Sequence, residues 1–250
     1  MKRNSLIRQA TKELGKEFRP LIKSATSRPS DINSIRDFTS KLLSKGGNVM
    51  PLADSINILC NSESTIPDAR NLLLGICRGA KKAKNNEQAL NLGKMYYKSL
   101  DLSSDSRLIT ALLICAMEMN DENFALSIAE FGVTDQVCIF EIINLIRRII
   151  QKEREKLEQE EISALVGKLL LQLRDKFSFS PHECKIIFRH YKQSNTGVAI
   201  HFGLQVNDYH DSKFNRVLCR ILSENDLLSE AYDISKQVSE ETGDSWHTTQ

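Results

Sequence analysis

The chain has 250 residues, of which 41% are hydrophobic, 6% aromatic and 26% charged. This length is sufficient for one large domain or a short array of repeats, and so few aromatic residues argue against a β-sandwich or β-barrel. The charge is uneven: residues 1–50 carry eleven Lys and Arg against four Asp and Glu, a net +7, whereas the other 200 residues carry −5.

The six cysteines are widely and irregularly spaced, and no Cys-x-x-Cys pair occurs. Most of them stand within apolar helical stretches, where a free thiol behaves as a small hydrophobic side chain. We expect no secretory leader, because no apolar core follows the basic N-terminus, and no run is apolar and long enough to span a bilayer. The sequence therefore predicts a protein of a reducing compartment, cytoplasmic, with peripheral attachment to a membrane as an alternative.

Three helices are predicted before residue 62. Residues 2–18 are amphipathic, with an apolar stripe on one side and Arg8, Lys12 and Lys16 on the other. A second helix covers residues 31–45 and stops at two glycines, and a third covers residues 51–60. Because the terminal repeats of an array need a cap, residues 1–62 are predicted to be basic helices that cap the array. Contact with an anionic membrane or another polyanion is the alternative for residues 1–45.

A five-residue signature of small, large, any, large and small residues occurs four times. Its copies begin at Ala89, Ala125, Ala199 and Ala231, so that the first two are 36 residues apart and the last two are 32 apart. A period in the mid-thirties is typical of one helical hairpin that is used repeatedly, with the small residues where neighbouring helices touch.

Four hairpins are predicted on this basis. Residues 70–96 align with residues 106–132 without a gap, and the polar turns of both fall at the same point. A third hairpin begins with the capping box Ser180-Pro181-His182-Glu183, and a fourth covers about residues 211–240. Residues 134–176 are predicted to form a fifth, elongated hairpin, whose first helix is indicated by Val137, Phe140, Ile143, Ile146 and Ile150.

In these residues the chain resembles the tetratricopeptide-repeat (TPR) proteins. Matching apolar and small positions are Leu73, Ile76, Ala89 and Gly93 in the first hairpin and Ile109, Leu112, Ala125 and Ala129 in the second. The Trp of the first helix and the Pro after the second are missing. The resemblance implies an all-α, right-handed solenoid of antiparallel helical hairpins, about 10–13 helices in all, over residues 63–240, followed by a polar tail at 241–250. It also implies a concave groove that binds a peptide, a helix or another protein.

No catalytic motif is present: the chain has no Gly-rich phosphate loop, no Gly-x-Ser-x-Gly and no His-Glu-x-x-His. Four histidines, His182, His190, His201 and His210, fall close together in sequence with Cys184 and Asp211. However, His182 and Cys184 are two residues apart on a helix and point in nearly opposite directions. We therefore expect surface histidines rather than a metal site, and no enzymatic activity, cofactor or small-molecule substrate.

The sequence thus predicts a non-enzymatic adaptor or scaffold that holds another protein. Helix phase predicts polar groove residues on the first helix of each hairpin, and the candidates for partner contact are Asn71, Arg78, Arg107, Thr110, Arg189 and Arg216. The alternative is a nucleic-acid or anionic-membrane binding module that uses residues 1–45 and the basic cluster of Arg78, Lys81, Lys82 and Lys84. Cations near a helix C-terminus also complement the helix dipole, so this cluster has an ordinary structural explanation as well.

Overall fold

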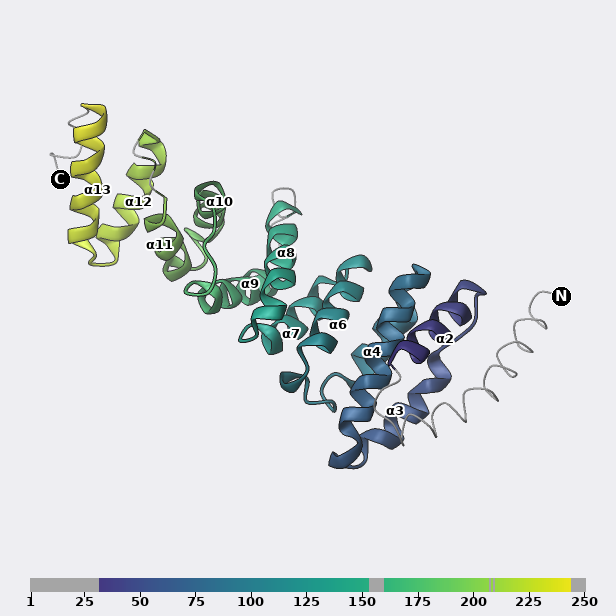
Figure 1. Cartoon of the computed structure of the whole chain (residues 1–250). Coiled ribbons are helices and arrows are strands. Elements are labelled where there is room, and N and C mark those ends of the chain that lie inside the picture. Colours follow the sequence, from purple (N-terminus) through teal and green to yellow (C-terminus); the bar gives the residue numbers. More distant parts are fainter. Residues whose placement is uncertain (1–31, 153–159, 207, 209, 244–250) are drawn as a thin grey trace. The chain divides into compact units, whose positions relative to one another are not determined.

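The computed structural model describes residues 32–152, 160–206, 208 and 210–243. All regular structure within these residues is helical, with twelve α-helices, three short 3-10 helices and no strand, which confirms the predicted all-α class. The chain divides into two compact units, residues 1–149 and 150–250, which we call unit 1 and unit 2 and describe separately (Figure 1). None of the described helices is both long and apolar enough to cross a lipid bilayer.

Unit 1 contains the helices α2 to α8. They are α2 (Ile32–Ser44), α3 (Ala53–Cys60), α4 (Ile66–Ala83), α5 (Glu87–Tyr96), α6 (Ser106–Glu118), α7 (Glu122–Gly132) and α8 (Gln136–Lys152), with 3-10 turns at Met50–Leu52, Glu63–Thr65 and Leu102–Ser104. The last three residues of α8 pass the boundary of the unit. Aspartates begin both helices of the second hairpin: Asp105 accepts from the N–H of Leu108 and Asp121 from that of Phe124, each at 3.2 Å.

Helices α2 and α4 run parallel and approach closely at two glycines. A Cβ on Gly75 would lie 2.5 Å from Ile35 Cγ2, and a Cβ on Gly79 would lie 2.5 Å from the carbonyl oxygen of Arg36 and from Thr39 Cβ. The contacts advance in the same direction along both helices, and only glycine leaves room for α2 at these two positions of α4. The close approach buries the apolar side of α2 against α4.

The first helices of the later hairpins continue this parallel arrangement. Near the starts of α6 and α8, the thiol of Cys138 donates to the Ser106 carbonyl at 3.4 Å. Near their ends, Arg148 Nη1 donates to the Met117 carbonyl at 2.6 Å. Figure 1 shows α2, α4, α6 and α8 following one another across the unit.

Within each pair the second helix returns antiparallel to the first. At the end of α7, a Cβ on Gly132 would lie 2.9 Å from Ile109 Cγ2, near the start of α6. The recurring signature marks such contacts: a Cβ on Gly93 of α5 would lie 2.5 Å from Leu112 Cδ2 of the next hairpin. Every small and large position of the first two signature copies is buried, as predicted.

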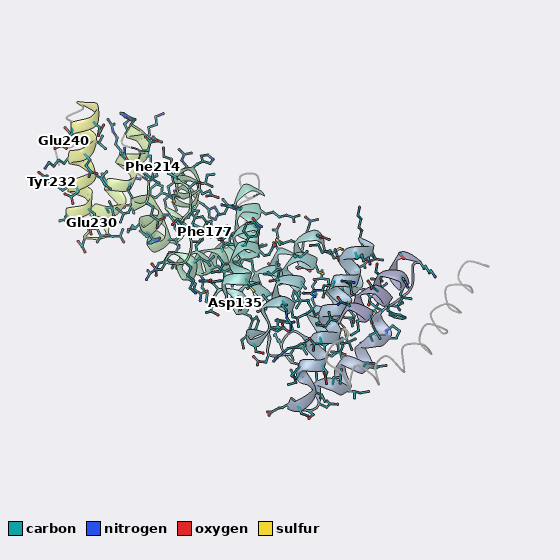
Figure 2. All side chains as sticks on the ribbon, viewed as in Figure 1. Asp135, Phe177, Phe214, Glu230, Tyr232 and Glu240 are labelled. Carbon is teal, nitrogen blue, oxygen red and sulfur yellow. The ribbon has the colours of Figure 1, made fainter. Side chains whose placement is uncertain are left out.

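Unit 2 contains α9 (Glu160–Leu173), α10 (Pro181–Tyr191), α11 (Thr196–Leu204), α12 (Ser212–Glu224) and α13 (Leu228–Thr242). The capping box predicted at the start of α10 is present: the N–H of Glu183 donates to Ser180 Oγ, and Glu183 accepts from the Ser180 N–H at 2.8 Å. Aromatic rings fill the core, where Phe188 meets Phe214 edge to face with centroids 4.8 Å apart; Phe214 is labelled in Figure 2.

The structure differs from two of the predictions. In the fourth signature copy, Ala231 is buried but Tyr232 is 67% exposed, because no described helix packs over that side of α13. The two halves of the predicted elongated hairpin fall in different units, α8 in unit 1 and α9 in unit 2. Their mutual packing, and the predicted boundaries at residues 62 and 240, stay predictions.

Candidate functional site

The exposed side of the first helices α4, α6 and α8 forms one surface, which we call the first-helix face of unit 1. Helices α4 and α6 meet through the thiols of Cys77 and Cys115, and hydrogen bonding between these thiols together with burial raises the pKa of Cys77. Each residue turns a helix by about 100°, so Arg78 lies about 100° ahead of Cys77 and Arg107 about 80° behind Cys115. For parallel helices these displacements point to the same side.

The same reasoning extends the face to α8. Thr110 Oγ1 lies 3.6 Å from Cys138 Sγ, which marks the sides by which α6 and α8 touch. Arg107 lies about 60° ahead of Thr110, and Val137 about 100° behind Cys138. The exposed stripes of α6 and α8 therefore open on the same side as that of α4.

Two large apolar side chains are exposed at the α8 edge of this face: Val137 lies on the face, and Phe140 falls about 60° behind Val137, on the side of α8 away from Cys138. The sequence did not predict that either would be exposed. Val137 is 63% exposed and Phe140 is 64% exposed, whereas Ile143 and Ile146 are buried. The spacing of the five apolar residues predicted one long helix, which α8 confirms. It did not show which of them are buried, because a step of three residues turns a helix by about 300° and places each side chain about 60° behind the last. The buried stripe of α8 instead uses steps of three and four residues: Cys138, Ile142, Leu145 and Ile149.

The predicted groove residues of unit 1 do gather on this face, in different states. Arg78 is exposed and Asn71, seven residues or about two turns earlier, is half-buried. The Arg107 side chain is 57% exposed, and its Nε lies 3.4 Å from Asp105 Oδ1. Thr110 is turned toward α8, so its hydroxyl serves the contact between helices.

A buried polar link joins the turn between α4 and α5 to the end of α6. Asn86, the N-cap of α5, is only 4% exposed; its amide donates to Glu118 Oε2, and its Oδ1 accepts from the Cys115 thiol at 3.7 Å. A buried amide without partners is costly, so these contacts favour one position of α6 on the preceding hairpin.

The basic cluster at the end of α4 has structural roles. Lys82 Nζ lies 3.1 Å from Asp37 Oδ1 on α2. Lys84 has a left-handed backbone, with φ of 53°, and its N–H bonds back to the carbonyls of the last helical turn. Lys81 is exposed. The other predicted basic residues, Arg8, Lys12 and Lys16, lie outside the described residues.

Unit 2 places the remaining candidates on its own first helices. Arg189 of α10 and Arg216 of α12 are both exposed, and Arg189 Nη2 lies 3.8 Å from Asp211 Oδ2. Sequence reasoning missed the ion cluster beside them, in which Lys185 Nζ meets Asp208 Oδ2 at 2.6 Å and Asp211 Oδ2 at 3.0 Å. No local sequence pattern predicts it, because Asp208 and Asp211 are more than twenty residues from Lys185 in the sequence.

These ion pairs shift the titration of all three groups. Burial opposes the charge on Lys185, but its hydrogen bonds to the two carboxylates outweigh burial and raise its pKa. Hydrogen bonding to Lys185 lowers the pKa of Asp208. For Asp211 burial again opposes the charge, and the bonds from the Phe214 N–H and from Lys185 lower its pKa. The cluster is therefore charged at neutral pH.

The histidines are dispersed over unit 2. His182 and His210 are exposed, His190 Nε2 lies 3.2 Å from Ser163 Oγ, and His201 Nε2 lies 2.8 Å from Gln205 Nε2. Burial lowers the pKa of His190 and of His201. Within the part of the chain that the structure describes, no three side chains of His, Cys, Asp or Glu come together as a metal site would require.

The chain was compared with protein-family models, curated proteins and solved structures. No protein-family model, curated protein or solved structure matches this chain.

Proposed function

We propose that this chain is a non-enzymatic adaptor, built as a TPR-like solenoid of helical hairpins, that binds another protein or a peptide through the first-helix face of unit 1. The observation that carries the proposal is the exposure of Val137 and Phe140 on that face. Exposed aromatic and aliphatic side chains among polar ones are typical of the centre of a protein interface. Asn71, Arg78 and Arg107 supply polar contacts around them.

The construction of unit 1 supports this role. Parallel helices that cross at glycines and are linked by the buried Asn86 hold the exposed stripes in a fixed order. A rigid surface loses little entropy when a partner binds. The face therefore suits recognition of one ordered partner rather than a loose association.

The test is affinity capture with full-length protein, followed by mass spectrometry, for three forms of the chain. The wild type is compared with the double variant Val137→Ser/Phe140→Ser and with Met95→Ser, which removes another exposed apolar side chain (55% exposed) from the second helix α5. Loss of a central aromatic contact costs about 2 kcal/mol, or roughly 30-fold in affinity. We expect the double variant to lose a partner that both other forms retain. If all three forms capture the same proteins, this face is not the binding surface.

A further inference from the structure

The first helices of unit 2 carry a stripe of cations on each helix. On α10 the stripe is Lys185, Arg189 and, at the C-cap, Lys192; on α12 it is Lys213, Arg216 and Arg220. Spacings of three, four and seven residues keep each set on one side of its helix. Five of these six residues are exposed, and Lys185 is half-buried in its ion cluster.

The two stripes open on the same side of unit 2. Helices α10 and α12 run parallel: Lys185 pairs with Asp211 just before α12, and three residues later Phe188 meets Phe214. Arg189 lies about 100° ahead of Phe188, and Lys213 lies about 100° behind Phe214. For parallel helices in contact, both displacements point to one side. We call this surface the basic face of unit 2.

The basic face stands out against the charge of the unit that carries it. Residues 150–250 contain thirteen Lys and Arg against sixteen Asp and Glu, yet the two stripes gather six of those cations. Acids lie beside part of the stripes: Asp208 and Asp211 hold Lys185, Asp211 also lies 3.8 Å from Arg189, and Glu224 lies 3.9 Å from Arg220 at the edge of ion-pair range. Like charges held side by side repel one another, so folding alone does not explain the concentration.

The chemistry of the face favours a phosphate backbone over a protein surface. No large apolar side chain is exposed among the described residues of α10 and α12, whereas a protein interface needs an apolar centre. Cations spaced along a surface are what neutralising successive phosphates requires. No Phe, Tyr or Trp is exposed on either helix to stack a base. Contacts to phosphates carry no sequence information, so recognition would not depend on base sequence.

We propose that the basic face of unit 2 binds a nucleic-acid backbone without sequence preference. This site is separate from the first-helix face of unit 1, and the proposal does not depend on the protein partner proposed there. Arg189, Lys192, Lys213, Arg216 and Arg220 contact phosphates, while Lys185 is held by its carboxylates and positions the loop before α12.

The test measures binding of the full chain to a fluorescein-labelled single-stranded RNA of 30 nucleotides, and to a DNA duplex of equal length, by fluorescence anisotropy at several salt concentrations. Four to five phosphate contacts to a single strand predict a slope of log affinity against log salt of about −3, which is roughly 60-fold between 50 and 200 mM salt. The variant Lys213→Glu/Arg216→Glu is expected to bind at least about ten-fold more weakly, with a shallower slope.

Three controls make the outcome decisive. Lys213→Arg/Arg216→Lys keeps the charge and is expected to bind as the wild type does, while Lys12→Glu/Lys16→Glu reverses two cations of the basic N-terminal segment. If the N-terminal reversal abolishes binding and the reversal on α12 leaves it intact, the proposal is wrong. It is also wrong if the wild type binds neither probe at 20 mM salt. It is wrong as well if the α12 variant binds both probes as the wild type does but no longer captures an acidic protein that the wild type captures. Thermal unfolding by circular dichroism checks that each variant is folded.

Discussion

Units 1 and 2 share one construction and differ in the chemistry of the surface it exposes. In both, the first helices of successive hairpins run parallel, and their exposed stripes lie on one side of the unit. In unit 1 that side exposes Val137 and Phe140, whereas in unit 2 it exposes arginines and lysines and no large apolar residue on α10 or α12. A repeated backbone arrangement can therefore present surfaces of different chemistry along one chain.

The units also differ in what holds their first helices together. In unit 1, α2 rests on glycines of α4, and backbone meets backbone. In unit 2, α10 and the start of α12 are joined by an edge-to-face ring pair and by an ion cluster. The contacts of unit 1 depend on shape, while those of unit 2 depend in part on charge. Each prediction below tests one side of this contrast.

The largest effect is expected from a substitution on the buried side of α8, compared with one on its exposed side. Ile146 is fully buried, so Ile146→Ala should lower the free energy of unfolding by about 2–5 kcal/mol. Phe140→Ala removes a larger side chain but from an exposed place, and should change it by about 0.5 kcal/mol. Urea titrations followed by circular dichroism measure both. Equal losses would mean that Phe140 belongs to the core and that unit 1 has no apolar contact surface there.

A smaller loss is expected where α2 crosses α4. In Gly79→Ala the new methyl group would meet the backbone oxygen of Arg36 at 2.5 Å, and since backbone cannot give way as a side chain can, we expect a loss of about 1–3 kcal/mol. The matched control is Gly197→Ala in α11, where the nearest atom is Asn195 Oδ1 at 3.7 Å. That change should be neutral or stabilise by up to about 1 kcal/mol. The same urea titration compares them, and a Gly79 variant as stable as its control contradicts the close approach.

Local signals in the sequence predicted much of this arrangement. The capping box at Ser180, the turns between the paired helices and the small residues at Gly93 and Ala129 are all set by nearby chain, and the structure confirms them. The exposure of Phe140 was not predicted, because apolarity alone does not report which side of a helix is covered. The contact of Lys185 with Asp208 depends on tertiary packing, which one sequence does not reveal.

The ion cluster of unit 2 predicts a pH dependence. Lys185→Met removes bonds to two carboxylates and should cost about 1–2 kcal/mol at pH 7, given the partial exposure of Asp208. Because folding lowers the pKa of both aspartates, their contribution is present above the unfolded value near 4. It is lost as the pH falls through the lowered values. The raised pKa of Lys185 keeps its contribution in place until the pH rises past the unfolded value near 10.4.

The measurement is the difference in urea midpoint between wild type and Lys185→Met at pH 7 and at pH 2.5. We expect a clear difference at pH 7 that becomes smaller at pH 2.5, as the two carboxylates are protonated. A difference of the same size at both pH values would show that Lys185 acts through Phe214, over whose ring its Nζ lies at 5.5 Å, and not through the two carboxylates. The contrast between the contacts of the two units would then fail.

The smallest effect is expected at the crossing of α2 and α4, from a buried hydroxyl group that has no hydrogen-bond partner there. Thr39 is fully buried, and among the described residues its Oγ1 is the buried side-chain oxygen or nitrogen without a hydrogen-bond partner. A buried hydroxyl without a partner costs free energy, and a methyl group of similar shape does not. Thr39→Val should therefore raise the free energy of unfolding by about 1 kcal/mol or less, whereas Thr39→Ser, which keeps the hydroxyl and loses the methyl group, should lower it. If valine destabilises as much as serine, the hydroxyl has a partner in solution, and the contact of α2 with α4 depends on more than shape.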